Sequence, residues 1–108
     1  MKPLLLSISL LIPTVAQADS FILGAGRWTC QEVIAAHRAQ DQGKILQVAG
    51  WLLGYWSSET KYRDDSFVNT VENAGGQAIY NQSVAECRNV PGVTMLYEMA
   101  NSMIGNTH

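Results

Sequence analysis

The sequence predicts a small all-α domain, a bundle of about four helices held together by one disulfide. Apolar residues recur at spacings of three and four along the chain, which is the period of an amphipathic helix, and no stretch alternates as a strand would. The chain has 108 residues, 47% of them hydrophobic, so it is long enough for one domain and apolar enough to fold. Its two cysteines, Cys30 and Cys87, are available for one bridge.

Residues 1–18 are expected to be a cleaved signal peptide. Met1 and Lys2 give a positive start, Leu4–Ile12 an apolar core, and Ala16-Gln17-Ala18 a small-x-small cleavage site. The apolar run of about ten residues is half of the roughly 20 that a bilayer requires. We therefore expect export to the periplasm, without stable membrane insertion.

Residues 19–27 contain two glycines and show no sustained period, so they are expected to form a flexible lead-in, with structure starting at Trp28. Thr29 and Glu32 have the spacing of a capping box, in which each side chain accepts a backbone N–H of the other residue. This predicts a first helix from Cys30 to about Ala39. Because the capping group is a carboxylate, we expect this cap to be sensitive to acid.

The clearest amphipathic helix follows the break at Asp41-Gln42-Gly43. Its main apolar stripe is Ile45, Val48, Ala49, Leu52 and Trp56. Trp51 and Tyr55 lie on another side, so this helix is either central and buried or meets a partner chain. Gly50 and Gly54, four residues apart, let another backbone approach closely, most simply as tight packing within the domain and alternatively in a homodimer.

The third helix is predicted to start at Phe67, capped by Asp65 or Ser66 after the charged loop 61–66. Gly75-Gly76 predicts a break or kink, because each glycine costs about 1 kcal/mol in a helix interior. The helix is expected to resume over about 77–88.

The last helix is predicted from about Val93 to Ile104, after the Pro91-Gly92 stop and with Gly105 just past its end. Met95, Met99 and Met103 repeat every four residues along this segment. They are interpreted as core residues, with an adaptable binding surface as the alternative.

An even number of cysteines in an exported chain predicts a disulfide between Cys30 and Cys87. It would tie the start of the first helix to the end of the third and close a loop of about 58 residues, for roughly 4 kcal/mol of stability. The histidines, His37 and His108, do not stand at metal-ligand spacing from a cysteine, so no metal site is predicted.

Composition argues against several functions. A formal net charge of −2 and a pI near 5.5 offer no basic surface for nucleic acid. His37, beside apolar neighbours, is interpreted as a half-buried packing residue, and Asp64-Asp65 as a solvated pair. No phosphate-binding glycine loop or zinc signature is present in the sequence, so we expect neither an enzyme nor a cofactor.

Two cysteine-centred motifs resemble a known family. Trp28-Thr29-Cys30-Gln31-Glu32, and Cys87-Arg88-Asn89-Val90-Pro91 followed by Leu96-Tyr97, are similar to the HdeA/HdeB family of periplasmic acid-stress chaperones, nearer to the HdeB branch. The resemblance implies one helical domain over 28–105 and a bridge between the same two cysteines.

The resemblance also implies a function. Members of this family are folded and usually dimeric near neutral pH, open partly in acid, and bind unfolding client proteins to prevent aggregation. The residues expected to form the client or dimer surface are Trp51, Leu52, Leu53, Tyr55 and Trp56. After cleavage at Ala18, six basic residues, two histidines and the amino terminus would give a charge near +9 in strong acid. The alternative is a periplasmic inhibitor or immunity-type protein that binds one specific partner.

Overall fold

The computed structural model describes residues 21–108, so the predicted signal peptide lies outside the described residues. Its α-helices are α2 (Cys30–Ala39), α3 (Gln42–Glu59), α4 (Asp65–Cys87) and α5 (Leu96–Gly105), with two short 3-10 helices, η2 (Gly24–Arg27) and η3 (Thr60–Tyr62). Residues 21–108 contain no strand beyond an isolated bridge between Thr29 and Met95. This confirms the all-α class and the number of helices predicted.

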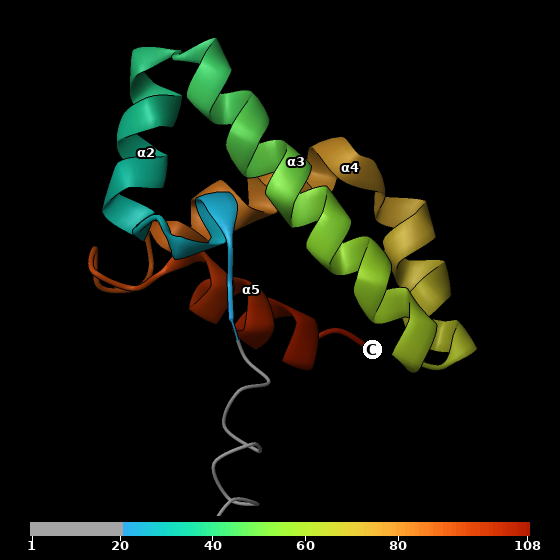
Figure 1. The fold of residues 1–108 in the computed structure, drawn as a ribbon. Helices are drawn as coiled ribbons and strands as arrows, with labels where there is room; N and C mark the ends of the chain where they lie inside the picture. The colour runs from blue at the N-terminus through green and yellow to red at the C-terminus, as the bar shows by residue number, and fades with distance from the viewer. Residues whose placement is uncertain (1–20) are drawn as a thin grey trace, which may run out of the picture.

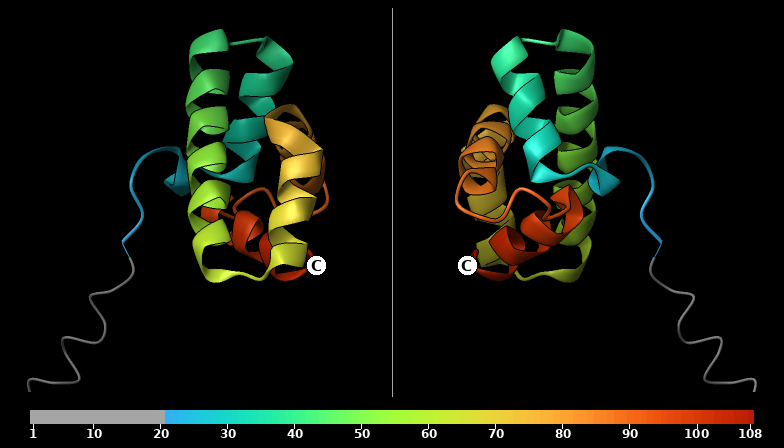
Figure 2. Two further views of the ribbon diagram at one scale, coloured as in Figure 1. Left: turned by 90° about the vertical axis from the view of Figure 1, so that its right-hand side faces the viewer. Right: turned by 90° about the vertical axis from the view of Figure 1, so that its left-hand side faces the viewer.

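The helices pack around α4. Helices α2 and α3 form an antiparallel hairpin, while α4 crosses behind α3 and α5 lies below (Figure 1). The side views place α2 and α3 next to each other with α4 on one side of the pair (Figure 2). Because α4 contacts α2, α3 and α5, it is the element that joins the bundle.

The predicted capping box begins α2. The Thr29 hydroxyl accepts from the Glu32 N–H at 3.2 Å, and the Glu32 carboxylate accepts from the Thr29 N–H at 2.8 Å. The helix ends at Ala39, as predicted, because Gln40 adopts a left-handed conformation with φ of 57°. Asp41 then caps α3 by accepting the Lys44 N–H at 3.2 Å.

Helix α3 buries the predicted stripe but not its glycines. Val48, Leu52 and Trp56 are buried. Gly50 and Gly54 are exposed, and a Cβ added to either would have no heavy atom within 4 Å other than its chain neighbours and the backbone of its own helix. The prediction of tight packing at these glycines is therefore wrong within the described residues. Both glycines lie on the outer face of the helix.

Helix α4 starts slightly before the predicted residue. Asp64 is the cap, because its carboxylate accepts the Phe67 N–H at 3.0 Å, and Asp65 is already helical, so the expected caps at Asp65 and Ser66 are corrected. The predicted kink is confirmed at Gly75, with φ of 79° and ψ of 166°. The two halves of α4 run in different directions on either side of it (Figure 1).

The lead-in is more ordered than expected near its end. Gly24–Arg27 form η2, with Ala25 and Gly26 buried. A Cβ at Gly26 would overlap the Trp51 ring, so the missing side chain is what lets the turn lie flat on that indole. Structure thus starts before Trp28, because Trp51 on α3 supplies a surface that local sequence does not reveal.

Helix α5 starts at Leu96, three residues later than predicted. Residues 91–94 form a turn, in which the Thr94 N–H donates to the Pro91 carbonyl, and Met95 is extended. This segment pairs with the start of α2: the Cys30 N–H donates to the Thr94 carbonyl at 2.7 Å, and the Leu96 N–H donates to the Trp28 carbonyl at 2.8 Å. These backbone groups therefore form hydrogen bonds between the two segments instead of within a longer α5. Gly105 is the last helical residue instead of lying past the end.

The disulfide joins Cys30 to Cys87, with Cα atoms 5.0 Å apart, and so ties the start of α2 to the end of α4 as predicted. Both cysteines are buried in a cluster formed by α2, α3, α4 and α5. A second cluster gathers Trp56, Phe67, Ile79 and Ile104 at the other end of the bundle. The covalent tie therefore lies at one end of the core only.

Candidate functional site

The five residues expected to form a client or dimer surface do not share one surface in the folded protein. Leu52 is fully buried and Trp56 is 4% exposed, both inside the core. Leu53 is 37% exposed and lies against Gly76 of α4. Trp51 and Tyr55 are half-buried. In the folded state α3 thus divides these side chains between the core, the surface and an intermediate shell.

Trp51 and Tyr55 form a stacked pair, with ring centroids 4.7 Å apart and an interplanar angle of 18°. The Tyr55 hydroxyl donates to Asn101 of α5. Burial and, to a lesser degree, nearby Glu59 raise the pKa of Tyr55, while the hydrogen bond to Asn101 lowers it. The pair is thus fixed between η2, which covers Trp51, and α5, which holds Tyr55.

The outer face of α3 carries no charge over most of its length. No charged residue occurs between Lys44 and Glu59. Leu46 is 66% exposed, and the exposed Gly50 and Gly54 continue the same face. We call Leu46, Gly50 and Gly54 the outer α3 face. It is uncharged, with small residues that leave room for an approaching chain.

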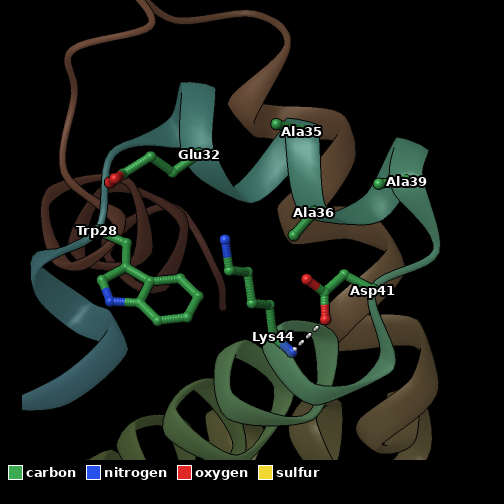
Figure 3. Close-up of a pocket in the computed structure, with 7 residues that line it drawn as sticks. All are labelled: Trp28, Glu32, Ala35, Ala36, Ala39, Asp41 and Lys44. Atoms are coloured by element: carbon green, nitrogen blue, oxygen red, sulfur yellow. Dashed lines mark hydrogen bonds between the residues drawn. The ribbon is translucent and has the colours of Figure 1, made fainter.

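A hollow of about 500 Å³ lies between α2 and α3. Ala35, Ala36 and Ala39 form one wall, while the Lys44 side chain extends into the hollow beside the Trp28 ring (Figure 3).

The acidic groups of this hollow, Glu32 and Asp41, are already bound to the backbone N–H groups at the starts of α2 and α3. Lys44 forms no ion pair among the described residues. Both carboxylates of the lining therefore act as helix caps.

The other singled-out residues have structural contacts. His37 is half-buried, with Nδ1 3.0 Å from the Tyr80 hydroxyl, in agreement with the packing interpretation. Burial raises the pKa of Tyr80. Asp64 caps α4 while Asp65 lies exposed in its first turn. Within residues 21–108 no three histidine, cysteine or acidic side chains are grouped to hold a metal.

The methionines of α5 divide between core and boundary. Met99 is 3% exposed and belongs to the main core cluster. Met95 and Met103 are half-buried, and Met103 contacts both clusters. Core filling is therefore confirmed for Met99. In the described part of the chain, no helix is sufficiently long and apolar to cross a bilayer.

Sequence reasoning missed one cap. Glu98 accepts the Met95 N–H at 3.0 Å at the start of α5. The usual signal is a serine or threonine three residues before the acid, and here that position holds Met95. Because the sequence contains only the acidic half of the capping pattern, this cap is hard to recognise from the residues alone.

Comparison with protein-family models, curated proteins and solved structures finds no match to this chain.

Proposed function

We propose that this protein is a periplasmic, non-enzymatic chaperone that loosens in acid and binds unfolding proteins to prevent their aggregation. The observation that carries the proposal is the chemistry of the helix starts. At the start of each of the four α-helices described in residues 21–108, a carboxylate accepts a backbone N–H. The four carboxylates belong, in chain order, to Glu32, Asp41, Asp64 and Glu98.

These caps stabilise the helix starts through the negative charge of the carboxylate. An ionised carboxylate at a helix start makes a charge-assisted hydrogen bond and interacts with the helix dipole, for about 0.3–1 kcal/mol at an exposed site. At pH 2–3, below the reference pKa values of aspartate and glutamate, most carboxylates are neutral. All four helix starts in residues 21–108 depend on a carboxylate interaction of this kind.

Charge repulsion acts in the same direction. One ion pair occurs among the described residues, between Glu59 and Arg63 on the surface. Few specific attractions therefore offset the repulsion between the positive charges. With its carboxylates neutral, the expected mature chain carries a charge near +9. The buried disulfide between Cys30 and Cys87 still limits expansion. A loosened but tethered chain is the state expected to bind clients.

The first client-binding surface to be uncovered is expected at Trp51. It is covered by η2, a single 3-10 turn with no side-chain cap. Detachment of this turn would uncover Trp51, which stacks on Tyr55, and would remove Ala25 from the core cluster while the disulfide stays in place. Further loosening would add Leu52, Leu53 and Trp56 to the same apolar surface.

The outer α3 face is our candidate for a homodimer contact near neutral pH. It is uncharged, and its exposed glycines would let two helices approach closely. Leu46→Glu is expected to weaken self-association in sedimentation analysis at pH 7. Val93→Glu is the control, because Val93 is 77% exposed on a loop outside this face. Equal sedimentation of wild type and Leu46→Glu would place any dimer contact elsewhere.

The chaperone proposal is tested by light scattering. An acid-sensitive client is brought to about pH 2–3 with and without the mature, oxidised protein, and suppression of scattering at near-stoichiometric ratios is expected. Failure to suppress scattering would overturn the chaperone proposal and favour the alternative, an inhibitor or immunity-type protein with one partner at neutral pH.

Trp51→Ala tests the client surface. It is expected to reduce protection, whereas Val93→Ala removes an exposed apolar side chain outside α3 and should leave protection unchanged. Both variants are first checked at pH 7 for retained helical content. Full protection by a folded Trp51→Ala variant would exclude this side chain from the client surface.

A further inference from the structure

An apolar groove lies where α4 bends, at the end of the bundle remote from the disulfide. Val71, Ala74, Ala78 and Ile79 line it from both sides of the kink at Gly75. Trp56 of α3 and Met103 of α5 complete the walls, and the volume is about 210 Å³. We call this the kink groove.

Trp56, in the wall of the kink groove, has an unused hydrogen-bond donor. Its side chain is 4% exposed, and one face of the indole lies on Phe67 with nearly parallel rings, 6.0 Å between centroids. Among the described residues, Nε1 of Trp56 is the buried side-chain nitrogen or oxygen that has no hydrogen-bond partner. Buried indole N–H groups usually have an acceptor, so this donor points to a ligand.

The rest of the lining defines what the groove accepts. No charged residue lines it. The hydroxyls at its rim already donate to backbone carbonyls. The Thr70 hydroxyl donates to the carbonyls of Ser66 and His108, and the Thr107 hydroxyl donates to that of Met103. The amide of Gln82, exposed at the rim, also lines the groove. The buried part of the lining is therefore complementary to a neutral molecule with an apolar body and an acceptor oxygen for Trp56. The volume exceeds the roughly 150 Å³ of an apolar cavity that binds benzene, so one ring with a short substituent fits.

We propose that the kink groove binds a small neutral molecule consisting of one aromatic ring or branched alkyl group and a carbonyl oxygen that accepts from Nε1 of Trp56. The nitrogen is shielded in the free protein, so a wall side chain moves when the ligand enters. Met103 suits this role, because it is half-buried and methionine adapts its three rotatable bonds at little cost. Its sulfur lies 3.8 Å from the Ser83 hydroxyl.

The test follows the Trp56 indole N–H directly. Protein labelled with nitrogen-15 is titrated at pH 7 with acetophenone, and the indole signals are assigned with a Trp56→Phe variant. A saturable downfield shift of the Trp56 signal is expected. Ethylbenzene has the same shape without the acceptor and should bind about tenfold more weakly, the factor expected for one hydrogen bond. Benzoate, the charged analogue, should not bind.

Matched variants locate the ligand. Ala78→Leu fills the groove from an exposed position of α4 and should lower acetophenone affinity by tenfold or more. Ala35→Leu makes the same change in the hollow beside α2 and should have no effect. Trp56→Phe should abolish or reverse the preference for acetophenone over ethylbenzene, because the carbonyl would then be buried without a donor.

Three results would overturn the proposal. The first is an unmoved Trp56 signal at saturating acetophenone, and the second is equal binding of acetophenone and ethylbenzene to the wild type. The third is tighter binding of N-acetylphenylalanine amide than of acetophenone, which would assign the groove to a peptide segment instead of a small molecule.

Discussion

Reduction of the Cys30–Cys87 disulfide should cost this domain a large share of its stability. The two cysteines are 57 positions apart, and in the chain-entropy model a loop of that length corresponds to about 4 kcal/mol. Domains of this size have unfolding free energies of about 5–15 kcal/mol. The reduced protein is therefore expected to be marginal at pH 7.

The expected shift is large enough to measure by urea denaturation. With a slope of about 1–2 kcal/mol per molar urea, a loss of 4 kcal/mol lowers the midpoint by about 2–4 M. Cys30→Ala/Cys87→Ala should lose slightly more than the reduced wild type, because both cysteine side chains are buried and alanine leaves a space.

The experiment compares oxidised and reduced wild type by circular dichroism. Since both cysteines are less than 2% exposed, reductant should act only on opened molecules, and the rate of reduction should rise with urea. Equal midpoints for oxidised and reduced protein would refute the loop-entropy reasoning. Rapid reduction in the absence of urea would refute the burial of the bridge.

Three further predictions concern single residues. Gly26→Ala should destabilise the protein by about 1–3 kcal/mol in urea denaturation, because the added Cβ meets the Trp51 ring. Gly50→Ala is the control, because it faces open space and should stabilise monomeric protein by up to about 1 kcal/mol. Similar values for the two variants would contradict the packing of η2. Gly75→Ala should cost about 1–3 kcal/mol by thermal unfolding, since alanine is strained at a φ of 79°, and an unchanged midpoint would mean that the kink is not required. Tyr80→Phe should lower the free energy of unfolding at pH 7 by about 1 kcal/mol, because it removes the hydrogen bond to His37. Burial raises the pKa of Tyr80 above its ordinary value of 10.0, so this tyrosine stabilises the fold below pH 10 and loses that contribution as the pH rises further. The free energy of unfolding between pH 8 and 12 should therefore depend less on pH in Tyr80→Phe than in the wild type. Identical pH profiles would contradict this.

Local chemistry explains which elements were predictable. The limits of α2 follow from the Thr29–Glu32 box and from the break at Asp41, all within a few residues of the helix. The kink at Gly75 follows from two adjacent glycines. These features depend on backbone groups satisfied by near neighbours, which a sequence displays directly.

The candidate site was less predictable, because exposure depends on distant segments. The sequence placed Leu52, Leu53 and Trp56 on one apolar helix, but the position of α4 buries Leu52 and Trp56 and leaves Leu53 partly exposed. Likewise the kink groove requires a bend in α4 and side chains from α3 and α5, which no single helix pattern contains.

By itself, the sequence determined that this is an all-α protein with a capped first helix, a bent third α-helix and a bridge between Cys30 and Cys87. Tertiary structure alone decided that η2 lies on Trp51, that the start of α5 is delayed by pairing with Trp28 and Cys30, and that Gly50 and Gly54 face outward. The physical reason is the range of the interactions. Caps and kinks are satisfied within one turn, whereas burial and pairing between segments depend on which distant surfaces the fold brings together.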